Sequence, residues 1–170
     1  MADLKGPEDE LKFIVDHNAG KLAKWLRKAG FDASLYTGAD DAALIAASLA
    51  ENRILLTRDR RIMKRRVIVR GLIRAILIES DQFRAQLLQV LSTLRLAKSR
   101  FRPFIYCLAC NQLLEERAKE AIQDRVPPYV YLTQEHFAEC PACHRLYWQG
   151  THWQAMNREL AGIPTNLEAD

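Results

Sequence analysis

Residues 13–81 alternate short apolar runs with segments of helical pattern, and this alternation limits the possible folds more than any other feature. The runs 13–15, 53–57 and 75–78 lead into Asp16, Asp59 and Glu79, and the alternating run 32–37 leads into Asp40 and Asp41. Apolar strands separated by helices predict a parallel sheet. The carboxyl ends of parallel strands lie on one edge, where ligands bind in α/β proteins. We therefore expect acidic side chains from distant parts of the sequence to meet at that edge and to form an active site.

The helical segments support an α/β fold for residues 12–98. In the helix expected at 20–29, the apolar residues Leu22, Trp25, Leu26 and Ala29 follow the spacing i, i+3, i+4, i+7 and share one face. Gly30 supplies a stop signal for this helix. Further helices are expected at 41–51 and 81–97, with a strand at 73–78 between them. The predicted N-terminal domain is thus a parallel sheet flanked by helices.

Four cysteines dominate the sequence after a linker at 99–103. Cys107 and Cys110 form one C-x-x-C pair, Cys140 and Cys143 form another, and 29 residues separate the pairs. Two such pairs supply four thiolates for a structural Zn²⁺ site with no open coordination position. The alternative is two redox-active or free pairs. We predict a small four-cysteine zinc ribbon followed by a C-terminal helix, together spanning residues 104–162.

Carboxylate oxygens are hard ligands that suit Mg²⁺ or Mn²⁺, and clustered acids repel one another unless a cation lies between them. A bound cation can activate water and offset the charge on a transferring phosphoryl group. Asp16 ends a buried strand, where an acid is costly unless it is bound or hydrogen-bonded. Asp59 follows the third strand, although capping of the next short helix would also explain it. Both are predicted catalytic residues and Mg²⁺ or Mn²⁺ ligands.

The other acidic candidates lie at expected helix starts. One of Asp40 and Asp41 is expected to cap the helix at 41–51, which leaves Asp41 as the predicted catalytic residue and metal ligand. Asp81 is the fourth catalytic candidate. Helix capping is the alternative role for Asp81, and Glu79 is the rival for the fourth position.

Charge and composition indicate the class of partner. The chain carries a formal charge of +4, and residues 58–70 contain seven Lys or Arg, which favours a polyanion but also fits a solvated surface. No apolar run approaches the roughly 20 residues that span a bilayer, so no membrane is expected. The polar N-terminus lacks an apolar signal core, which predicts a cytoplasmic protein.

Together these motifs resemble the Mut-seven C-terminal RNase domain family, whose nuclease fold is PIN-like. The resemblance rests on F-I-V-D-x3-G-K-L-A-K-W-L-R-K-A-G-F-D, D-D-x2-L and R-I-L-L-T-R-D, followed by C-L-A-C-N-x2-L, V-P-P and C-P-A-C-x-R-x-Y-W-x-G-T-H. It covers residues 12–160 and implies a metal-dependent RNase. The family's strand-one, helix-start and T-R-D acids map to Asp16, Asp41 and Asp59, with Asp81 the nearest match for the fourth acid. The chain departs from the family at His17-Asn18-Ala19, where methionine and leucine are usual.

The leading hypothesis is a ribonuclease that uses Mg²⁺ or Mn²⁺, with a zinc ribbon that grips or positions the RNA. His144 and His152, beside Tyr147, Trp148 and Trp153, could contact nucleic acid, because aromatic rings stack on bases. These aromatic residues could equally form the core of the ribbon. One alternative is a non-catalytic RNA- or ribosome-binding zinc protein. Another is a nuclease held inactive by a regulatory protein partner.

Overall fold

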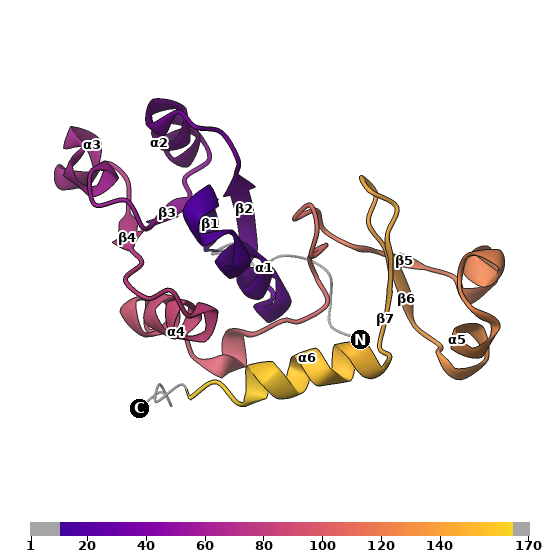
Figure 1. The fold of residues 1–170 in the computed structure, drawn as a ribbon. Helices are drawn as coiled ribbons and strands as arrows, with labels where there is room; N and C mark the ends of the chain where they lie inside the picture. The colour runs from indigo at the N-terminus through magenta and orange to yellow at the C-terminus, as the bar shows by residue number, and fades with distance from the viewer. Residues whose placement is uncertain (1–10, 165–170) are drawn as a thin grey trace.

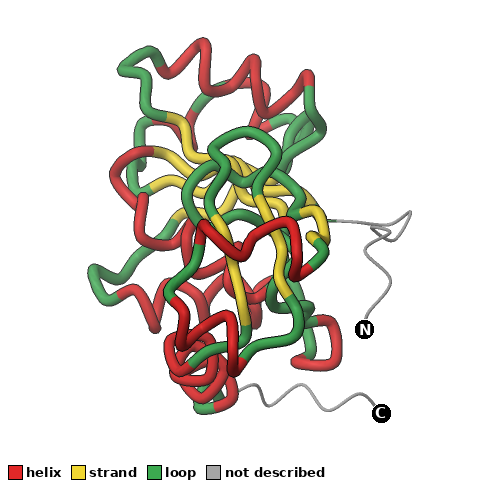
Figure 2. The backbone as a smooth tube through the Cα atoms, turned by 90° about the vertical axis from the view of Figure 1, so that its right-hand side faces the viewer, coloured by secondary structure: helices red, strands yellow, loops and turns green. Residues whose placement is uncertain are grey.

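A computed structural model describes residues 11–164 and shows an α/β domain joined to a small antiparallel sheet (Figure 1). The larger sheet is entirely parallel, with the strand order β2-β1-β3-β4. Its strands are β1 (Lys12–Asp16), β2 (Asp32–Tyr36), β3 (Ile54–Thr57) and β4 (Ala75–Leu77). Figure 2 shows these strands in the interior, with helices outside them and the smaller sheet in front. The predicted α/β class and the parallel sheet flanked by helices are confirmed.

Side chains alternate between two cores because successive residues of a strand point to opposite faces. On one face, Phe13 and Val15 pack with α1 (Gly20–Ala29) and α4 (Phe83–Thr93). On the other face, Ile14 and Leu55 pack with α2 (Asp41–Ala50) and with the segment leading to α3 (Arg66–Val69). The 3₁₀ turns η1 (His17–Ala19), η2 (Ile62–Lys64) and η3 (Lys98–Arg100) complete this part. Both faces of the sheet are covered, which leaves its edges for ligands.

Gly30 ends α1 where a side chain would not fit. Its φ of 91° is in the left-handed region, and its N–H donates to the carbonyls of Leu26 and Arg27. A Cβ atom at this position would lie 2.1 Å from the carbonyl oxygen of Arg102. Glycine therefore serves both the helix end and the close approach of the chain that leads to the cysteines.

The ribbon (residues 104–150) contains the antiparallel sheet β5-β6-β7. Its elements are β5 (Glu115–Arg117), η4 (Lys119–Arg125), α5 (Pro128–Thr133), β6 (Phe137–Glu139) and β7 (Leu146–Trp148). One small core surrounds Cys107 and Cys140, and another surrounds Ile122 and Phe137. Neither core is large, which is the situation in which a metal commonly stabilises a fold.

The last helix, α6 (Thr151–Ala161), connects the two parts of the molecule. In Figure 1 it runs from the base of the ribbon toward α4. Leu160 and Ile163 belong to the same core as Phe13. Lys28 Nζ lies 3.7 Å from Glu159 Oε2, and Lys98 Nζ donates to the carbonyl of Ala161 over 2.7 Å. The helix that follows the ribbon in sequence therefore packs on the N-terminal domain.

Two expected elements are shorter than predicted. The strand expected at 73–78 is Ala75–Leu77, and the helix expected at 81–97 is Phe83–Thr93. Arg95 has a φ of 52°, so the chain turns out of the helix although its apolar pattern continues. Within residues 11–164, no helix combines the length and apolar character needed to cross a membrane.

Candidate functional site

Asp16 lies at the carboxyl edge of the sheet, on a central strand between β2 and β3. Its side chain is only 5% exposed. Oδ2 accepts hydrogen bonds from Thr57 Oγ1 at 2.9 Å and from Asn18 Nδ2 at 3.3 Å. His17 Nδ1 lies 2.8 Å from Oδ1, and the His17 side chain is 55% exposed. The carboxylate is thus fixed on its buried side by Thr57 and is covered by an exposed imidazole on its open side.

Asp59 is connected to Asp16 through Thr57. The Thr57 hydroxyl donates to Asp16 and accepts from the backbone N–H of Asp59 over 3.1 Å. The carboxylate of Asp59 accepts from the backbone N–H of Arg61 at 2.7 Å and from Arg61 Nη2 at 2.8 Å. These bonds from the side chain and backbone of Arg61 lower the pKa of Asp59. The carboxylate is therefore ionised at neutral pH.

The other predicted acids have separate environments. Asp40 caps α2, because its Oδ1 accepts from the Ala42 N–H over 2.9 Å. Asp41 is the first residue of that helix, and its Oδ2 lies 3.6 Å from Arg65 Nη2. Asp81 is 80% exposed and pairs with Arg58. The residue before α4 is Gln82, so Asp81 does not occupy the N-cap position that was its alternative role.

A common pattern joins these acids. The basic segment (residues 58–70) supplies the arginine that pairs with each of Asp41, Asp59 and Asp81. Asp59 raises the pKa of Arg61, and Asp41 adds to the same effect. Two of the predicted acids therefore act on one guanidinium. Each acid thus pairs with a different arginine, and within residues 11–164 no three of the predicted acids have carboxylate oxygens that all lie within 4.8 Å of one another. The role of each acid as a metal ligand stays a prediction.

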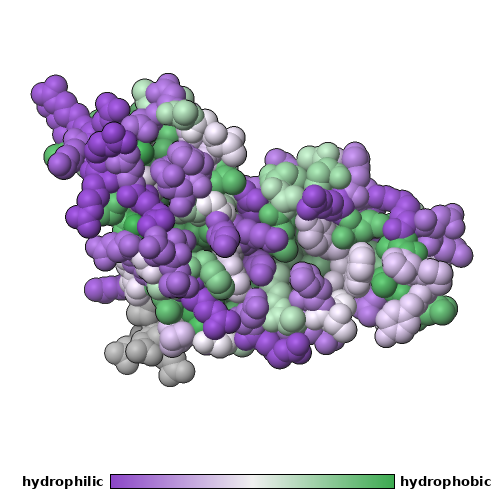
Figure 3. All heavy atoms as spheres, viewed as in Figure 1, coloured by the Kyte–Doolittle hydropathy of each residue, from purple (hydrophilic) through white to green (hydrophobic). Residues whose placement is uncertain are grey.

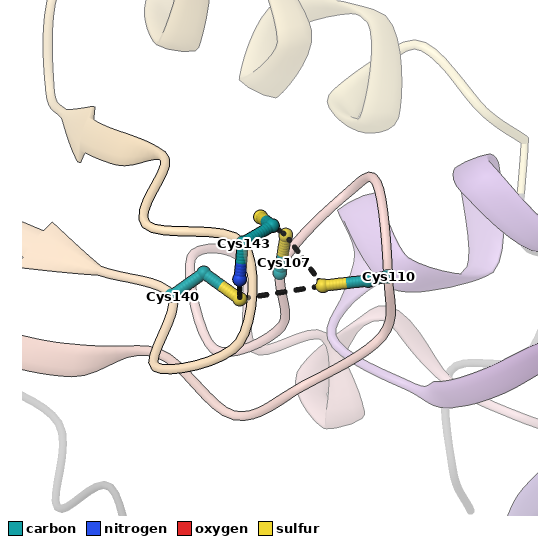
Figure 4. A group of neighbouring side chains, drawn as sticks. All are labelled: Cys107, Cys110, Cys140 and Cys143. Atoms are coloured by element: carbon teal, nitrogen blue, oxygen red, sulfur yellow. Dashed lines mark hydrogen bonds between the residues drawn. The ribbon is translucent and has the colours of Figure 1, made fainter.

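The cysteines form a compact group (Figure 4). In the part of the chain that the structure describes, they are the one set of three or more His, Cys, Asp or Glu residues whose ligand atoms all lie within 4.8 Å of one another. Cys110 Sγ lies 3.4 Å from Cys107 Sγ and 3.3 Å from Cys140 Sγ, and Cys107 Sγ lies 3.6 Å from Cys143 Sγ. Four sulfurs at about 2.3 Å from a tetrahedral Zn²⁺ would lie about 3.8 Å apart. The sulfur positions therefore fit zinc.

The two C-x-x-C loops have the same local geometry. In each, the residue after the second cysteine has a left-handed backbone, with φ of 66° at Asn111 and 58° at His144. Asn111 N–H donates to the carbonyl of Cys107, and His144 N–H donates to the carbonyl of Cys140. Burial raises the pKa of Cys107, but hydrogen bonds from Tyr147 and backbone amides outweigh it and lower the pKa to about 6. Cys107 is thus prepared to bind metal as a thiolate.

The family model described as Mut7-C RNAse domain matches residues 11–160. The chain belongs to this family. No curated protein and no solved structure matches the chain. Membership in the Mut7-C RNAse domain family indicates a ribonuclease-related function, and the cysteine group indicates metal binding.

In this Mut7-C chain the first cysteine loop contacts the edge of the larger sheet directly. The buried guanidinium of Arg27 donates to the carbonyls of Ala33, Leu108 and Ala109 over 2.7, 3.0 and 3.1 Å. Asn111 Oδ1 accepts from the N–H of Ala33 at 2.8 Å, which occupies a donor on the edge strand β2. The loop therefore covers this edge and protects it from other strands.

Thr57 and Arg27 make functional contacts that were not expected from the sequence. Thr57 is the last residue of a buried strand, and a hydroxyl at that position beside two acids is a usable signal for a hydrogen-bonding role. Arg27 belongs to a run of Lys and Arg on α1 whose pattern is typical of a solvated face, yet it is 5% exposed. Its partners Leu108 and Ala109 lie about 80 residues further along the chain, so local pattern carries no sign of them.

Glu139 is a buried carboxylate that holds the ribbon sheet together. Its oxygens accept from Arg117 Nε and Arg125 Nη2, each over 2.8 Å, and its side chain is 8% exposed. These hydrogen bonds lower the pKa of Glu139 from 4.5 to about 2. Because the pKa is depressed in the folded state, the stabilisation is fully present above pH 4.5 and is lost as the pH falls toward 2.

Glu139→Gln is expected to lower the free energy of unfolding of the zinc-loaded protein by about 2 kcal/mol, because two arginines lose their buried anion. The difference from the parent should be constant between about pH 6 and 8, where Glu139 is ionised. Glu115→Gln is the matched control, since Glu115 also binds Arg117 but is 53% exposed. Denaturant unfolding should show a change below about 1 kcal/mol for this control. Equal losses in the two variants would contradict the assignment.

Proposed function

We propose that this Mut7-C chain is a metal-dependent ribonuclease that hydrolyses RNA phosphodiester bonds at the carboxyl edge of the parallel sheet. The observation that carries the proposal is that Thr57 links the buried Asp16 to Asp59, which itself pairs with Arg61 of the exposed basic segment. A nuclease needs acids for metal ions and cations for phosphates at the same place. Family membership supports RNA as the substrate class.

The donor set suits Mg²⁺ or Mn²⁺, because Asp16, Asp41 and Asp59 offer carboxylate oxygens and lie at or just beyond strand ends or at a helix start. When bound, the ion would supply an activated water and offset the charge that builds on the phosphoryl group. Asp16 contributes a fixed anion, held by Thr57 and Asn18. Asp59 and Asp41 currently neutralise arginines, and each would exchange that partner for the ion.

The basic segment is suited to bind the RNA backbone. Its cations without a carboxylate partner, judged over residues 11–164, are Arg60, Lys64, Arg66 and Arg70. All four are exposed. Residues 12–98 hold 17 Lys or Arg and 8 Asp or Glu, a formal charge of +9. Figure 3 shows many strongly hydrophilic residues over the end of the molecule that carries α2 and α3, and others over the ribbon. Phosphate contacts therefore belong to this end of the N-terminal domain.

The ribbon has a different charge balance. Residues 104–150 contain four Lys or Arg and six Asp or Glu, a formal charge of −2. This balance supports an indirect role in RNA binding, through the contacts of Arg27 and Asn111 that hold the sheet edge. Direct contact of His144 or His152 with RNA stays a prediction.

The test is cleavage of a labelled single-stranded RNA by the zinc-loaded protein, with and without added Mn²⁺ or Mg²⁺. We expect cleavage that requires the added ion and a Mn²⁺ site distinct from zinc, detected by electron paramagnetic resonance. Asp59→Asn should weaken that Mn²⁺ binding at least about tenfold, because one charged ligand is lost. Arg60→Gln is the control for Mn²⁺ binding, since Arg60 has no carboxylate partner within the described chain and should affect RNA affinity alone.

A non-catalytic RNA- or ribosome-binding protein is the second candidate, and the arginine pairs favour it as well, since paired acids can be purely structural. The same experiment separates the two functions. RNA binding with no cleavage and no Mn²⁺ site beyond zinc would replace the nuclease proposal with this one.

A further inference from the structure

The ribbon and the start of α6 form a groove that the proposed nuclease site does not use. Its volume is about 640 Å³, within the range of roughly 300–1,000 Å³ that is typical of ligand sites. The walls come from α5, β7, the first residues of α6 and the chain before and after Tyr106. None of the residues that line it is Asp, Glu, Lys or Arg. The groove is thus an uncharged site within an otherwise charged module.

Six of the residues that line the groove are Phe, Tyr or Trp. Phe104 makes edge-to-face contacts with Tyr147 and Trp153, with ring centres 6.3 and 6.5 Å apart. Trp148 stands over Gly150, where a Cβ atom would lie 2.8 Å from its Nε1. Tyr129 is 75% exposed at the groove and is available to a ligand. These rings provide a large apolar contact area, and their side chains lose little conformational entropy when a ligand binds.

A free strand edge accompanies the aromatic walls. β7 is the last strand in the order β5-β6-β7, and within residues 11–164 no strand pairs with its other edge. All three residues of β7 line the groove. An edge strand offers unpaired N–H and C=O groups to an extended chain, and adjacent apolar pockets accept alternate side chains. The combination suits a peptide in extended conformation.

Charge separates a peptide from RNA as the occupant. The ribbon has a formal charge of −2, and four thiolates around one Zn²⁺ would add further negative charge. Glu116 is exposed and is paired with Ala138, which is paired in turn with Tyr147. Glu116 therefore lies on the same face of the sheet as Tyr147, which lines the groove. Phosphates would be repelled by this surface, whereas Lys or Arg beside an apolar segment would be attracted.

We infer that this groove binds an extended segment of a partner protein, with apolar or aromatic side chains in the groove, flanking Lys or Arg residues, and backbone hydrogen bonds to β7. The inference goes beyond ribonuclease activity and does not depend on it. The groove would give a regulatory protein a binding surface on the side of the molecule that carries the cysteines.

The test uses the full zinc-loaded chain without Mn²⁺, Mg²⁺ or RNA. The probe is a peptide of six alternating valine and phenylalanine residues with a lysine at each end. The readout is the change in tryptophan fluorescence, because Trp148 and Trp153 line the groove and Trp25 lies elsewhere. We expect a saturable change. N-methylation of alternate peptide amides should weaken binding about tenfold by removing the hydrogen bonds to β7. Replacing the lysines with glutamates should weaken it at least about threefold.

Matched variants locate the site. Tyr129→Ser should weaken binding about tenfold, whereas Leu132→Ser should change it less than about twofold. Both residues lie on α5 and are about equally exposed, at 75% and 76%, but Leu132 does not line the groove. No saturable response, or equal losses in the two variants, would overturn the inference. So would a response to single-stranded RNA that Tyr129→Ser abolishes, or self-association of the protein through the groove, detected by sedimentation.

Discussion

Asp16→Asn is expected to lower the rate of RNA cleavage about 1,000-fold or more under conditions in which the parent protein cleaves. Asparagine keeps the shape of the side chain but removes the negative charge that a divalent ion requires. Asp16 has no neighbouring acid on its own strand to replace it, and its carboxylate is fixed by Thr57 and Asn18. The loss should therefore appear in the chemical step, measured as single-turnover cleavage of a labelled RNA at saturating protein.

Two further variants serve as comparisons for that result. Glu51→Gln changes an acid that is 53% exposed and pairs with Arg53 just before β3, at the opposite edge of the sheet, so its cleavage rate should match the parent. Asp81→Asn tests the fourth position, and a loss smaller than that of Asp16→Asn is expected because Asp81 is 80% exposed. A thermal melt establishes that each variant is folded. Equal cleavage by Asp16→Asn and the parent would mean that the site is misassigned or that the activity is a contaminant.

The sequence was sufficient for those features that depend on local pattern. The apolar stripe of α1 and the stop at Gly30 predicted the helix with its observed bounds, and the C-x-x-C spacing predicted a group of four sulfurs. The acids at the strand ends were recognisable because each lies at or just after the end of an apolar or alternating run. Their pairing with Arg58, Arg61 and Arg65 was not, since any of seven basic residues in that segment could have faced the acids.

Packing between elements that are distant in the sequence could not be predicted. A helix after the ribbon was expected from the sequence, but nothing local indicates that Leu160 would join the core of a strand about 145 residues earlier. Leu94 continues the apolar spacing of α4, yet the left-handed Arg95 ends the helix so that Leu96 can enter the core. In both cases burial against a distant element determined the structure, because such burial outweighs the intrinsic helix propensity of the residues.

Removal of zinc is expected to destabilise the whole chain and not the ribbon alone. Structural zinc sites contribute about 10 kcal/mol or more of apparent binding energy, and the two small ribbon cores offer little to replace it. The thermal midpoint should fall by at least about 10 °C after chelation, and Cys140→Ser should have a similar effect. Calorimetry of the metal-loaded and chelated proteins measures the change, and restored zinc should reverse it.

The contacts of the first cysteine loop predict where the N-terminal domain should respond. Without zinc, Asn111 would lose the geometry that lets it accept from the N–H of Ala33, and Arg27 would lose the carbonyls of Leu108 and Ala109. Hydrogen exchange at Ala33 should therefore accelerate on chelation well before exchange at Leu55, whose N–H donates to the carbonyl of Arg74 in the interior of the sheet. Arg27→Met should accelerate hydrogen exchange at Ala33 in the same way while zinc stays bound, since the cysteines are unchanged. If chelation releases zinc and leaves Ala33 protected, the edge of the sheet does not depend on the metal, and the two parts of the molecule are stabilised independently.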